Sequence, residues 1–402
     1  MNDQLRSQFP ALSRLHQGKP LVYFDGPAGA QVPQSVIDAV SDYYMRYNAN
    51  THGAFLTTHE TDDMLHHTRQ AVAALLGAEG ADTISFGQNM TTLNFSLSRA
   101  IGRVLQPGDE VLITQLDHES NRGPWLALRE QGIVVKEIKL RMDGTLNLES
   151  LEAQLSHRTR LVAMGYASNI FGTVNDVAHA RKLAYEAGAW LLVDAVHYAP
   201  HFPVDVQALG CDFLLCSAYK FYGPHVGLLY CKPGLLDRLP TDRLRTAYQH
   251  APYSIETGTL NHAAIAGVKA AIEFIASQGK GNSLRDRLLS AYGIIGAHEA
   301  ALAKLLYSGL SAIPAISVKG PGIQAPMRAP TFSFTFAGKR PEEVCTHLAQ
   351  HNIFAWDGHF YAIRATEVMG LLEQGGVTRV GVVAYNTREE VEQLLSALEE
   401  LG

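Results

Sequence analysis

The sequence predicts an α/β protein in which a mostly parallel sheet lies between helices and a smaller α+β domain follows. Short apolar runs alternate with helical patterns from about residue 82 to 232, which is typical of β-α-β units. The 402 residues, 47% of them apolar and 18% charged, suffice for two domains. Beyond these units, a long helical stretch precedes separate strands and helices. We expect a large domain over 20–265 and a smaller domain over 1–19 and 266–402.

One strand of the predicted sheet delivers a lysine at its end. The apolar run Phe213–Cys216 is followed by Lys220 and by the turn Gly223-Pro224, so it predicts a buried strand. A lysine placed where a core strand ends can lose its proton and attack a carbonyl carbon. A lysine that simply ends a strand at the surface is the alternative.

The preceding strand ends in an acid. The apolar run Trp190–Val193 leads into Asp194, and His197 follows. Parallel strands that end in Asp194 and Lys220 place a carboxylate and an amine at the same rim of the sheet, where α/β proteins bind ligands. This pair suits pyridoxal phosphate, because the lysine forms the Schiff base and the carboxylate keeps a proton on the pyridine nitrogen. An ordinary buried ion pair would leave the same pattern.

The residues around this pair resemble a known family. Asp194-Ala195-Val196-His197 and Ser217-Ala218-Tyr219-Lys220, with Tyr222-Gly223-Pro224, resemble the class V aminotransferase superfamily, in particular its cysteine desulfurase and selenocysteine lyase branch. The resemblance extends from about residue 20 to the C-terminus. It implies the fold type I of pyridoxal-phosphate-dependent transferases, with a seven-stranded, mostly parallel sheet and a C-terminal domain that covers the cofactor. It also implies that Ser217 and Tyr219 contact the cofactor beside Lys220.

Composition argues against nucleic acids and membranes as partners. The net charge is −6 and no basic cluster occurs. The start, Met1–Ser7, lacks an apolar signal core, and no run approaches the roughly 20 apolar residues of a membrane span. Glycine-rich dinucleotide and triphosphate motifs do not occur either. We therefore expect a cytoplasmic protein that acts on a small molecule.

The cysteines predict neither a metal site nor a redox pair. Cys211, Cys216, Cys231 and Cys345 show no Cys-x-x-Cys spacing. Cys211 and Cys216 differ by an odd number of positions, so on one strand they would face opposite ways and could not share a metal. We expect buried structural thiols.

The next candidates lie near the N-terminus. A short strand within 21–25 leads into a Gly/Pro loop, and Pro33 opens a helix that ends near Tyr47. The resemblance implies that Ala28–Ala30 face the substrate. It also implies that Asn50 and His52, in the following loop, contribute to the site, although a plain loop at the helix exit would look the same.

A turn after the strand 82–87 is the candidate phosphate site. We expect a helix over Phe95–Val104, and a helix start offers unpaired N–H groups and a positive dipole end. The hydroxyls of Thr91 and Thr92 add donors. The resemblance implies that these threonines and Met90 hold the cofactor phosphate, whereas a simple threonine cap is the alternative.

Two further strands lead to cofactor-contacting candidates. His118 follows the strand 111–114, and a histidine there can lie flat on an aromatic ring and exchange protons with a substrate. The resemblance implies that His118 stacks on the cofactor. It also implies that Asn169 binds the oxygen of the ring hydroxyl, with His197 beside it where most relatives have glutamine.

The resemblance also bears on assembly. Glu256-Thr257-Gly258-Thr259 is similar to a family turn whose threonine reaches the phosphate bound by the neighbouring subunit. Thr259 therefore implies a homodimer with shared active sites.

The C-terminal part supplies an arginine and a departure from the family pattern. We expect strands over 331–336 and 378–383 and helices over 341–351 and 388–401, with a loop-like stretch over 313–328. The resemblance implies that Arg379 clamps the substrate carboxylate through two parallel hydrogen bonds. A surface ion pair is the alternative.

The departure lies in Trp356-Asp357-Gly358-His359-Phe360-Tyr361. Cysteine desulfurases of this kind carry Arg-x-Gly-His-His-Cys there, and the cysteine takes sulfur from the substrate as a persulfide. Trp356 stands in place of the arginine and Tyr361 in place of the cysteine, while His359 is retained as a substrate contact. A phenol cannot hold a persulfide, but Tyr361 can transfer a proton.

These residues together predict a pyridoxal-phosphate enzyme that acts on an amino acid. Lys220 forms the Schiff base and moves the α-proton, Asp194 sustains the electron sink, and His118 stacks on the ring. Loss of a β-substituent such as sulfur is the first hypothesis. Amino-group transfer or racemisation by a class V enzyme is the second, and a catalytically silent cofactor-binding protein is the third.

Overall fold

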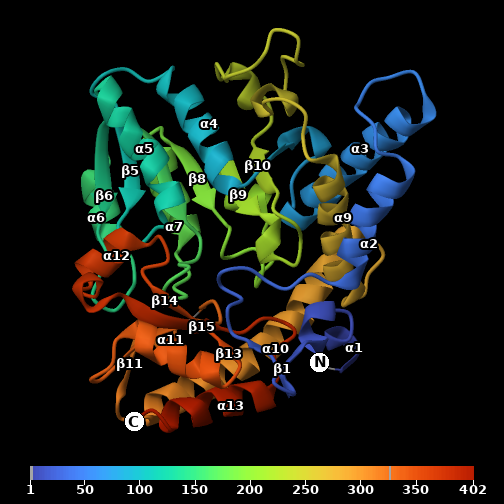
Figure 1. Ribbon diagram of the computed structural model, residues 1–402. Helices are drawn as coiled ribbons and strands as arrows, with labels where there is room; N and C mark the ends of the chain where they lie inside the picture. The colour runs from blue at the N-terminus through green and yellow to red at the C-terminus, as the bar shows by residue number, and fades with distance from the viewer. Residues whose placement is uncertain (1–2, 326) are drawn as a thin grey trace.

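The large domain is built on a seven-stranded sheet, as predicted. The computed structural model describes residues 3–325 and 327–402, and Figure 1 shows this sheet above a smaller C-terminal domain. The strand order is β4-β10-β9-β8-β7-β5-β6. β10 runs antiparallel to both of its neighbours, β4 and β9, and the remaining pairs are parallel. The strands are β4 (Ile84–Gly87), β5 (Glu110–Thr114), β6 (Val134–Ile138), β7 (Thr159–Gly165), β8 (Trp190–Asp194), β9 (Phe213–Ser217) and β10 (Gly227–Cys231).

Helices cover both faces of this sheet because its strands are apolar on both sides. In β8, Leu191 and Val193 join one hydrophobic cluster and Leu192 joins the other. Helices α3, α7 and α9 contribute to the first cluster, and α4 and α5 contribute to the second. Their bounds are α3 (Leu56–Leu76), α4 (Met90–Gly102), α5 (Gly123–Leu126), α7 (Val177–Glu186) and α9 (His262–Ser277), and α2 (Gln34–Arg46) packs beside α9.

The C-terminal domain pairs a four-stranded antiparallel sheet with three helices. Its strand order is β11-β12-β15-β14. Phe332, Phe334 and Val380 from the sheet meet Leu306 and Leu394 from the helices in a separate buried cluster. The elements are α10 (Leu284–Ala312), β11 (Ile316–Lys319), β12 (Thr331–Phe336), α11 (Pro341–Gln350), β14 (Trp356–Gly358), β15 (Val377–Gly381) and α13 (Arg388–Glu399).

Helix caps explain where the observed helices differ from the expected ones. We expected the helix after β4 to begin at Phe95, but α4 begins at Met90, because Asn89 and Thr92 form a reciprocal capping box. The expected long helical region after residue 262 is two helices, and Ser283 caps the second of them. No helix in the described part of the chain is long and apolar enough to cross a membrane.

The N-terminal segment joins the two domains. Strand β3 (Val22–Tyr23) pairs in parallel with β13 (Ile353–Phe354), and Phe24 lies in the C-terminal domain's core. The boundary expected at residue 265 falls inside α9, which packs against α2 and α3 of the large domain. The division of the chain into two domains at that residue stays a prediction.

Candidate active site

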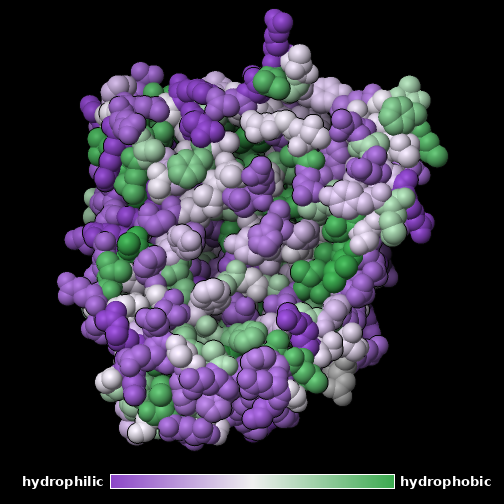
Figure 2. All heavy atoms as spheres, in the orientation of Figure 1, coloured by the Kyte–Doolittle hydropathy of each residue, from purple (hydrophilic) through white to green (hydrophobic). Residues whose placement is uncertain are grey.

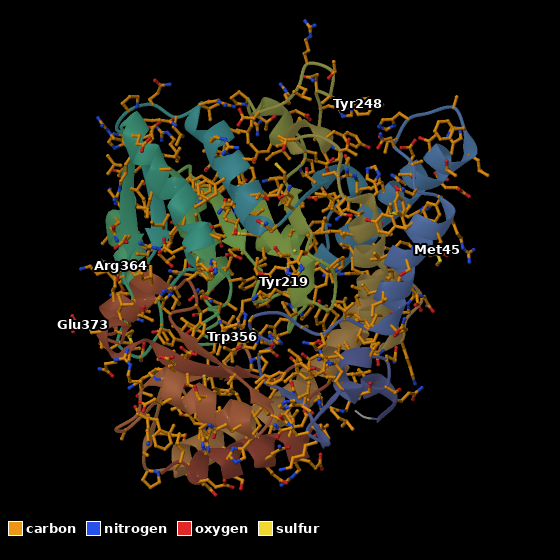
Figure 3. All side chains as sticks on the ribbon, viewed as in Figure 1. Met45, Tyr219, Tyr248, Trp356, Arg364 and Glu373 are labelled. Atoms are coloured by element: carbon orange, nitrogen blue, oxygen red, sulfur yellow. The ribbon has the colours of Figure 1, made fainter. Side chains whose placement is uncertain are left out.

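A cavity of about 530 Å³ lies between the carboxyl ends of the large sheet's strands and the C-terminal domain. In Figure 3, Tyr219 of the large domain and Trp356 of the C-terminal domain are labelled at this junction. Both side chains line the cavity, as does Ala28. The other predicted site residues that line it are Met90, Thr91, His118, Asn169, Asp194, His197, Ser217, Lys220, His359, Tyr361 and Arg379.

Lys220 and Asp194 come from neighbouring strands and enter this cavity together. Lys220 follows β9 in a short turn, and its ammonium nitrogen donates to the Pro27 carbonyl. Burial, with help from the nearby Arg379 cation, lowers the pKa of Lys220 to about 7. Burial raises the pKa of Asp194 to about 7, and its Oδ1 accepts from the Val196 N–H at 2.9 Å. An amine that readily gives up its proton therefore lies in the same pocket as a carboxyl group.

His118 is held as a neutral imidazole. Its Nδ1 accepts from the main-chain N–H of Ser120 at 3.0 Å and lies 2.7 Å from the Ser120 hydroxyl. Burial, and then the cations Lys220 and Arg379, lower the pKa of His118 to about 4. The proton therefore resides on Nε2, and the ring is fixed by a bond to its own loop.

Asp117, to which the sequence analysis assigned no role, positions this loop. Its carboxylate is buried and accepts from the Gly165 N–H at 2.9 Å and from the Asn121 side chain at 2.8 Å. These bonds tie the ends of β5 and β7 together in front of the cavity. The sequence feature that could have identified Asp117 is an acidic residue shortly after a predicted buried strand.

The N-terminus of α4 opens into the cavity. Asn89, Met90 and Thr91 line it, and the Met90 N–H donates to the Ser217 hydroxyl at 3.0 Å. The hydroxyl of Thr92 donates to the Asn89 carbonyl, so it caps the helix, and Thr92 faces an adjoining hollow. The Met90 and Thr92 N–H groups are thus already bonded, and an anion at this end of the 13-residue helix would meet its positive dipole and the lining residue Thr91. Asn89 is a lining residue that the sequence analysis did not name.

Arg379 brings a buried cation to the cavity from the C-terminal domain. Its Nη1 donates to the Asn169 carbonyl at 2.8 Å, and its guanidinium lies 3.9 Å from the centre of the Phe360 ring. The Asn169 side chain donates to the Phe360 carbonyl at 2.9 Å. Burial lowers the pKa of Arg379 to about 9, and the nearby Asp25 opposes this. Arg379 therefore stays charged near neutral pH and presents its remaining N–H groups to the cavity.

His197 packs beside a buried histidine–glutamate hydrogen bond. Its Nε2 lies 2.9 Å from the Thr331 hydroxyl, and burial holds its pKa well below the usual range. The ring of His201 is 5.7 Å away, and its Nδ1 lies 2.8 Å from a carboxylate oxygen of Glu299. Figure 1 shows that α10, which carries Glu299, runs beneath the large domain.

The segment with Trp356 and Tyr361 forms the outer wall of the cavity. Phe360 and Tyr361 have φ angles of 51° and 58°, a strained conformation for residues other than glycine. The turn is held because the Tyr361 carbonyl accepts from the Glu119 N–H at 2.7 Å. The Tyr361 ring lies 5.3 Å from the His118 ring.

No cysteine is among the described residues that line this cavity. Cys211, Cys216 and Cys231 are buried, as expected, whereas Cys345 is half-buried on α11. Burial raises the pKa of Cys211 and of Cys345 to about 12. The thiols are therefore neither present at the site nor reactive at neutral pH.

Besides Thr92, three predicted residues lie outside this cavity. Asn50 and His52 are on the loop between α2 and α3, which projects from the large domain (Figure 1), and the His52 N–H donates to the Asp62 carboxylate at 3.0 Å. Thr259 lines the adjoining hollow together with Thr92 and His225. Within one chain these residues are not brought to Lys220.

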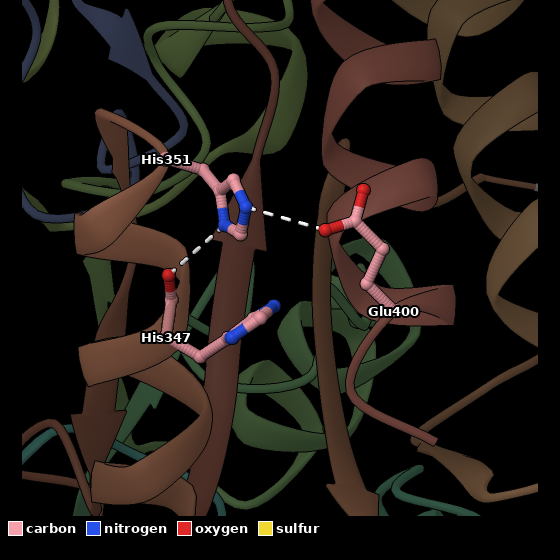
Figure 4. Close-up of side chains that lie close together, drawn as sticks. All are labelled: His347, His351 and Glu400. Atoms are coloured by element: carbon pink, nitrogen blue, oxygen red, sulfur yellow. Dashed lines mark hydrogen bonds and ion pairs between the residues drawn. The ribbon is translucent and has the colours of Figure 1, made fainter.

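Among the described residues, one cluster of possible metal ligands lies at the C-terminal ends of α11 and α13 (Figure 4). The ligand atoms of His347, His351 and Glu400 lie within 4.8 Å of one another. His347 Nε2, however, donates to the Ala397 carbonyl at 2.7 Å, and His351 Nδ1 donates to the His347 carbonyl at 3.2 Å. The histidines thus satisfy helix carbonyls and attach the end of α13 to α11.

The donor set of the cavity fits pyridoxal phosphate, the cofactor that the resemblance implies. Lys220 offers an amine with a pKa of about 7, and Asp194 offers a carboxyl group at the end of the adjacent strand. The start of α4 offers its positive dipole end and the lining residue Thr91 for a phosphate, and His118 offers a neutral ring. Each chemical part of the cofactor therefore has a partner of suitable charge among the lining residues.

Comparisons with known proteins agree with this geometry. A family model described as aminotransferase class-V matches residues 22–394. The cysteine desulfurase of Enterobacter sp. (strain 638) is 34% identical over 415 residues, which cover 99% of this chain and 98% of the relative. The apo structure of cysteine desulfurase from Thermococcus onnurineus NA1 has a TM-score of 0.88 and 28% identity, over 100% of this chain and 98% of that one. The cysteine desulfurase CsdA of Escherichia coli, in an S-sulfonic acid form, has a TM-score of 0.86 and 28% identity over the same shares.

The family match spans most of the chain, and the relatives align from end to end. The chain therefore belongs to the class V aminotransferase family, and it is a pyridoxal-phosphate enzyme of the cysteine desulfurase-like branch.

Proposed function

We propose that this protein is a lyase that removes a β-substituent, with sulfur the first candidate, from an amino acid. The observation that carries the proposal is the joint placement of Lys220, Asp194 and Arg379 in one cavity whose described lining holds no cysteine. Bound pyridoxal phosphate would supply the electron sink for the negative charge that develops at the substrate α-carbon.

The chain's own residues have distinct roles in this proposal. Lys220 holds the cofactor and then takes the α-proton on its nitrogen, which its pKa of about 7 suits. Asp194 holds a proton on the pyridine nitrogen, and His118 stacks on the ring. Arg379 binds the substrate carboxylate, with its position set by the bond to the Asn169 carbonyl.

Tyr361 distinguishes this chain from a desulfurase that passes sulfur to its own thiol. Its hydroxyl can return a proton to a leaving group, but it cannot carry sulfur. The turn at Phe360 and Tyr361 places the Tyr361 ring 5.3 Å from the His118 ring. We therefore propose that sulfur leaves with solvent or with a small-molecule acceptor rather than as a protein persulfide.

Amino-group transfer or racemisation is the second candidate, because both need the same lysine and arginine and no acceptor thiol. A keto acid made only in the presence of a second keto acid would identify transfer. Loss of optical activity without a new product would identify racemisation. The third candidate is a protein that binds the cofactor and catalyses nothing. Such a protein would not need the set of catalytic side chains found here: Lys220, Asp194, His118 and Arg379.

The test is an absorption spectrum of the purified protein followed by product analysis. Borohydride should trap pyridoxal phosphate on Lys220, and cysteine or another β-substituted amino acid should yield pyruvate and ammonium. Lys220→Ala should abolish both results. Alanine with sulfane sulfur would indicate desulfuration despite Tyr361, and no turnover across a broad panel of amino acids would favour the silent protein.

We also propose a homodimer with shared active sites. Large apolar side chains are exposed on α2 and at the start of α3, where Figure 2 shows hydrophobic atoms at the right-hand side. Asn50, His52 and Thr259 lie outside their own chain's cavity. In the proposed dimer they contribute to the active site of the second copy. Light scattering should give twice the mass of one chain. Replacement of Phe55 and Leu56 by serine should shift this mass toward one chain.

A further inference from the structure

The outer wall of the cavity contains aromatic rings on either side of Arg379. Trp356 and Arg379 are directly opposite each other in the antiparallel pair β14–β15, so their side chains share one face of the sheet. Phe360 covers the guanidinium at 3.9 Å. A carboxylate bound by Arg379 would therefore lie beside an indole and a phenyl ring.

The depth of each residue indicates where a substrate side chain extends. Lys220 and Arg379 are 9% and 4% exposed, whereas Trp356 and Tyr361 are 52% and 67% exposed. An amino acid with its carboxylate at Arg379 and its α-carbon at Lys220 has both of these groups in the buried part. Its β-substituent then extends toward the mouth, where Trp356 and Tyr361 present large apolar surfaces.

The backbone of the aromatic wall is strained at Phe360 and Tyr361, which indicates that the shape of this wall serves substrate binding. Phe360 and Tyr361 are two consecutive residues with positive φ, and such a conformation persists only where neighbours enforce it. Here the Phe360 carbonyl accepts from Asn169 and the Tyr361 carbonyl accepts from the Glu119 N–H. The large domain therefore holds the aromatic turn against the cavity.

We infer that the substrate is a cysteine S-conjugate, an amino acid whose sulfur carries an aryl or bulky alkyl group. This inference rests on the proposed lyase function. Free cysteine would leave the aromatic mouth unfilled, whereas an apolar group on sulfur would bury its surface against Trp356 and Tyr361. Such a substrate also explains why no thiol is needed in the cavity, because the sulfur leaves as a complete thiol.

The reaction balances without an oxidant or an acceptor. Lys220 removes the α-proton, and the bond between the β-carbon and sulfur breaks with both electrons going to sulfur. The sulfur takes up a proton and leaves as the thiol RSH. The aminoacrylate that remains is hydrolysed by one water to pyruvate and ammonium. In this proposal Tyr361, which lines the cavity, supplies the proton to sulfur.

Three substrates and two unreactive ligands test this inference on the cofactor-loaded protein. The substrates are S-phenylcysteine, cysteine and β-chloroalanine, the last as a general elimination substrate. The ligands are 3-(phenylthio)propanoate and 3-mercaptopropanoate, which lack the amino group. We expect kcat/KM for S-phenylcysteine to exceed that for cysteine at least tenfold. Calorimetry should show 3-(phenylthio)propanoate binding at least tenfold more tightly than 3-mercaptopropanoate.

Two variants test whether Trp356 causes the preference for the phenylthio group. Trp356→Ala should raise KM for S-phenylcysteine and weaken 3-(phenylthio)propanoate binding at least fivefold. Tyr185→Ala removes a more exposed aromatic ring, from α7, and should change neither the KM nor the ligand binding. Both side chains are exposed, so we expect both variants to fold.

The outcomes separate the two proposals. Pyruvate from β-chloroalanine without a preference for S-phenylcysteine, or without an effect of Trp356→Ala, would overturn the S-conjugate inference and leave the lyase standing. No pyruvate from any of the three substrates would overturn the lyase itself. Alanine from cysteine as the main product would overturn both.

Discussion

The pKa of Lys220 predicts how quickly the cofactor-free protein captures pyridoxal phosphate as pH changes. Only the neutral amine can attack the aldehyde. With a pKa lowered from 10.5 to about 7, one Lys220 in two is neutral at pH 7, against roughly one in three thousand for an ordinary lysine. We therefore expect capture to be about 10³-fold faster than for an exposed lysine and to level off above pH 7.

Two substitutions should shift the midpoint of this pH profile in opposite directions. The Arg379 cation lowers the pKa of Lys220, so Arg379→Gln should move the midpoint of the rate profile to higher pH. The Asp194 carboxylate raises this pKa, so Asp194→Asn should move the midpoint to lower pH. Arg388→Gln, at an exposed site on α13, should move it in neither direction.

The assay mixes cofactor-free protein with pyridoxal phosphate between about pH 5 and pH 10, a range that spans both lysine pKa values. Borohydride stops each sample, and mass spectrometry counts the cofactor attached to Lys220. A rate that still rises steeply beyond pH 9, or midpoints that move the same way in both variants, would refute the assignment of a buried amine at this position.

Three further predictions concern stability and reactivity. Lys220→Met should stabilise the cofactor-free protein at pH 7. The shift of the Lys220 pKa from 10.5 to about 7 corresponds to about 5 kcal/mol, of which about 4 kcal/mol is expressed at pH 7, and the lost bond to Pro27 offsets about 1 kcal/mol. The folded-state pKa lies below the unfolded one, so this gain should shrink as pH rises from 7 toward 10, and denaturant unfolding that shows no gain at pH 7 would contradict it. Iodoacetamide should leave turnover unchanged because the four thiols are buried or half-buried, and inactivation that parallels labelling of Cys345 would argue otherwise. Glu299→Ala should lower the free energy of unfolding by about 1–3 kcal/mol because it leaves the buried His201 Nδ1 without its partner, while Glu392→Ala on the surface of α13 should have little effect.

Much of the fold follows from local patterns that the sequence displays directly. The runs that became β8 and β9 are continuous and apolar, so they predict buried strands whatever their neighbours are. β11 (Ile316–Lys319) lay in a stretch expected to be a loop. It is short, lies between proline and glycine, and gains its order by pairing with β12. The start of α4 was also misplaced, although Asn89 followed by Thr92 was a readable cap signal.

The sequence likewise predicts some parts of the site and not others. Lys220, Asp194 and His118 lie just past strand ends, and parallel strands bring such ends together without further information. The bond between Asn169 and the Phe360 carbonyl joins segments from different domains, and no local pattern announces it. The register that sets Trp356 opposite Arg379 likewise depends on long-range pairing.

The parallel pairing of β3 with β13 has a consequence for synthesis on the ribosome. The two strands are separated by roughly 330 residues, so β3 leaves the ribosome roughly 20 to 60 s before its partner at typical elongation rates. During that interval Val22 and Phe24 lack the core that later buries them. Nascent chains that stop short of residue 353 should therefore expose this segment to protease and to chaperones, and they should become resistant there only once β13 has emerged.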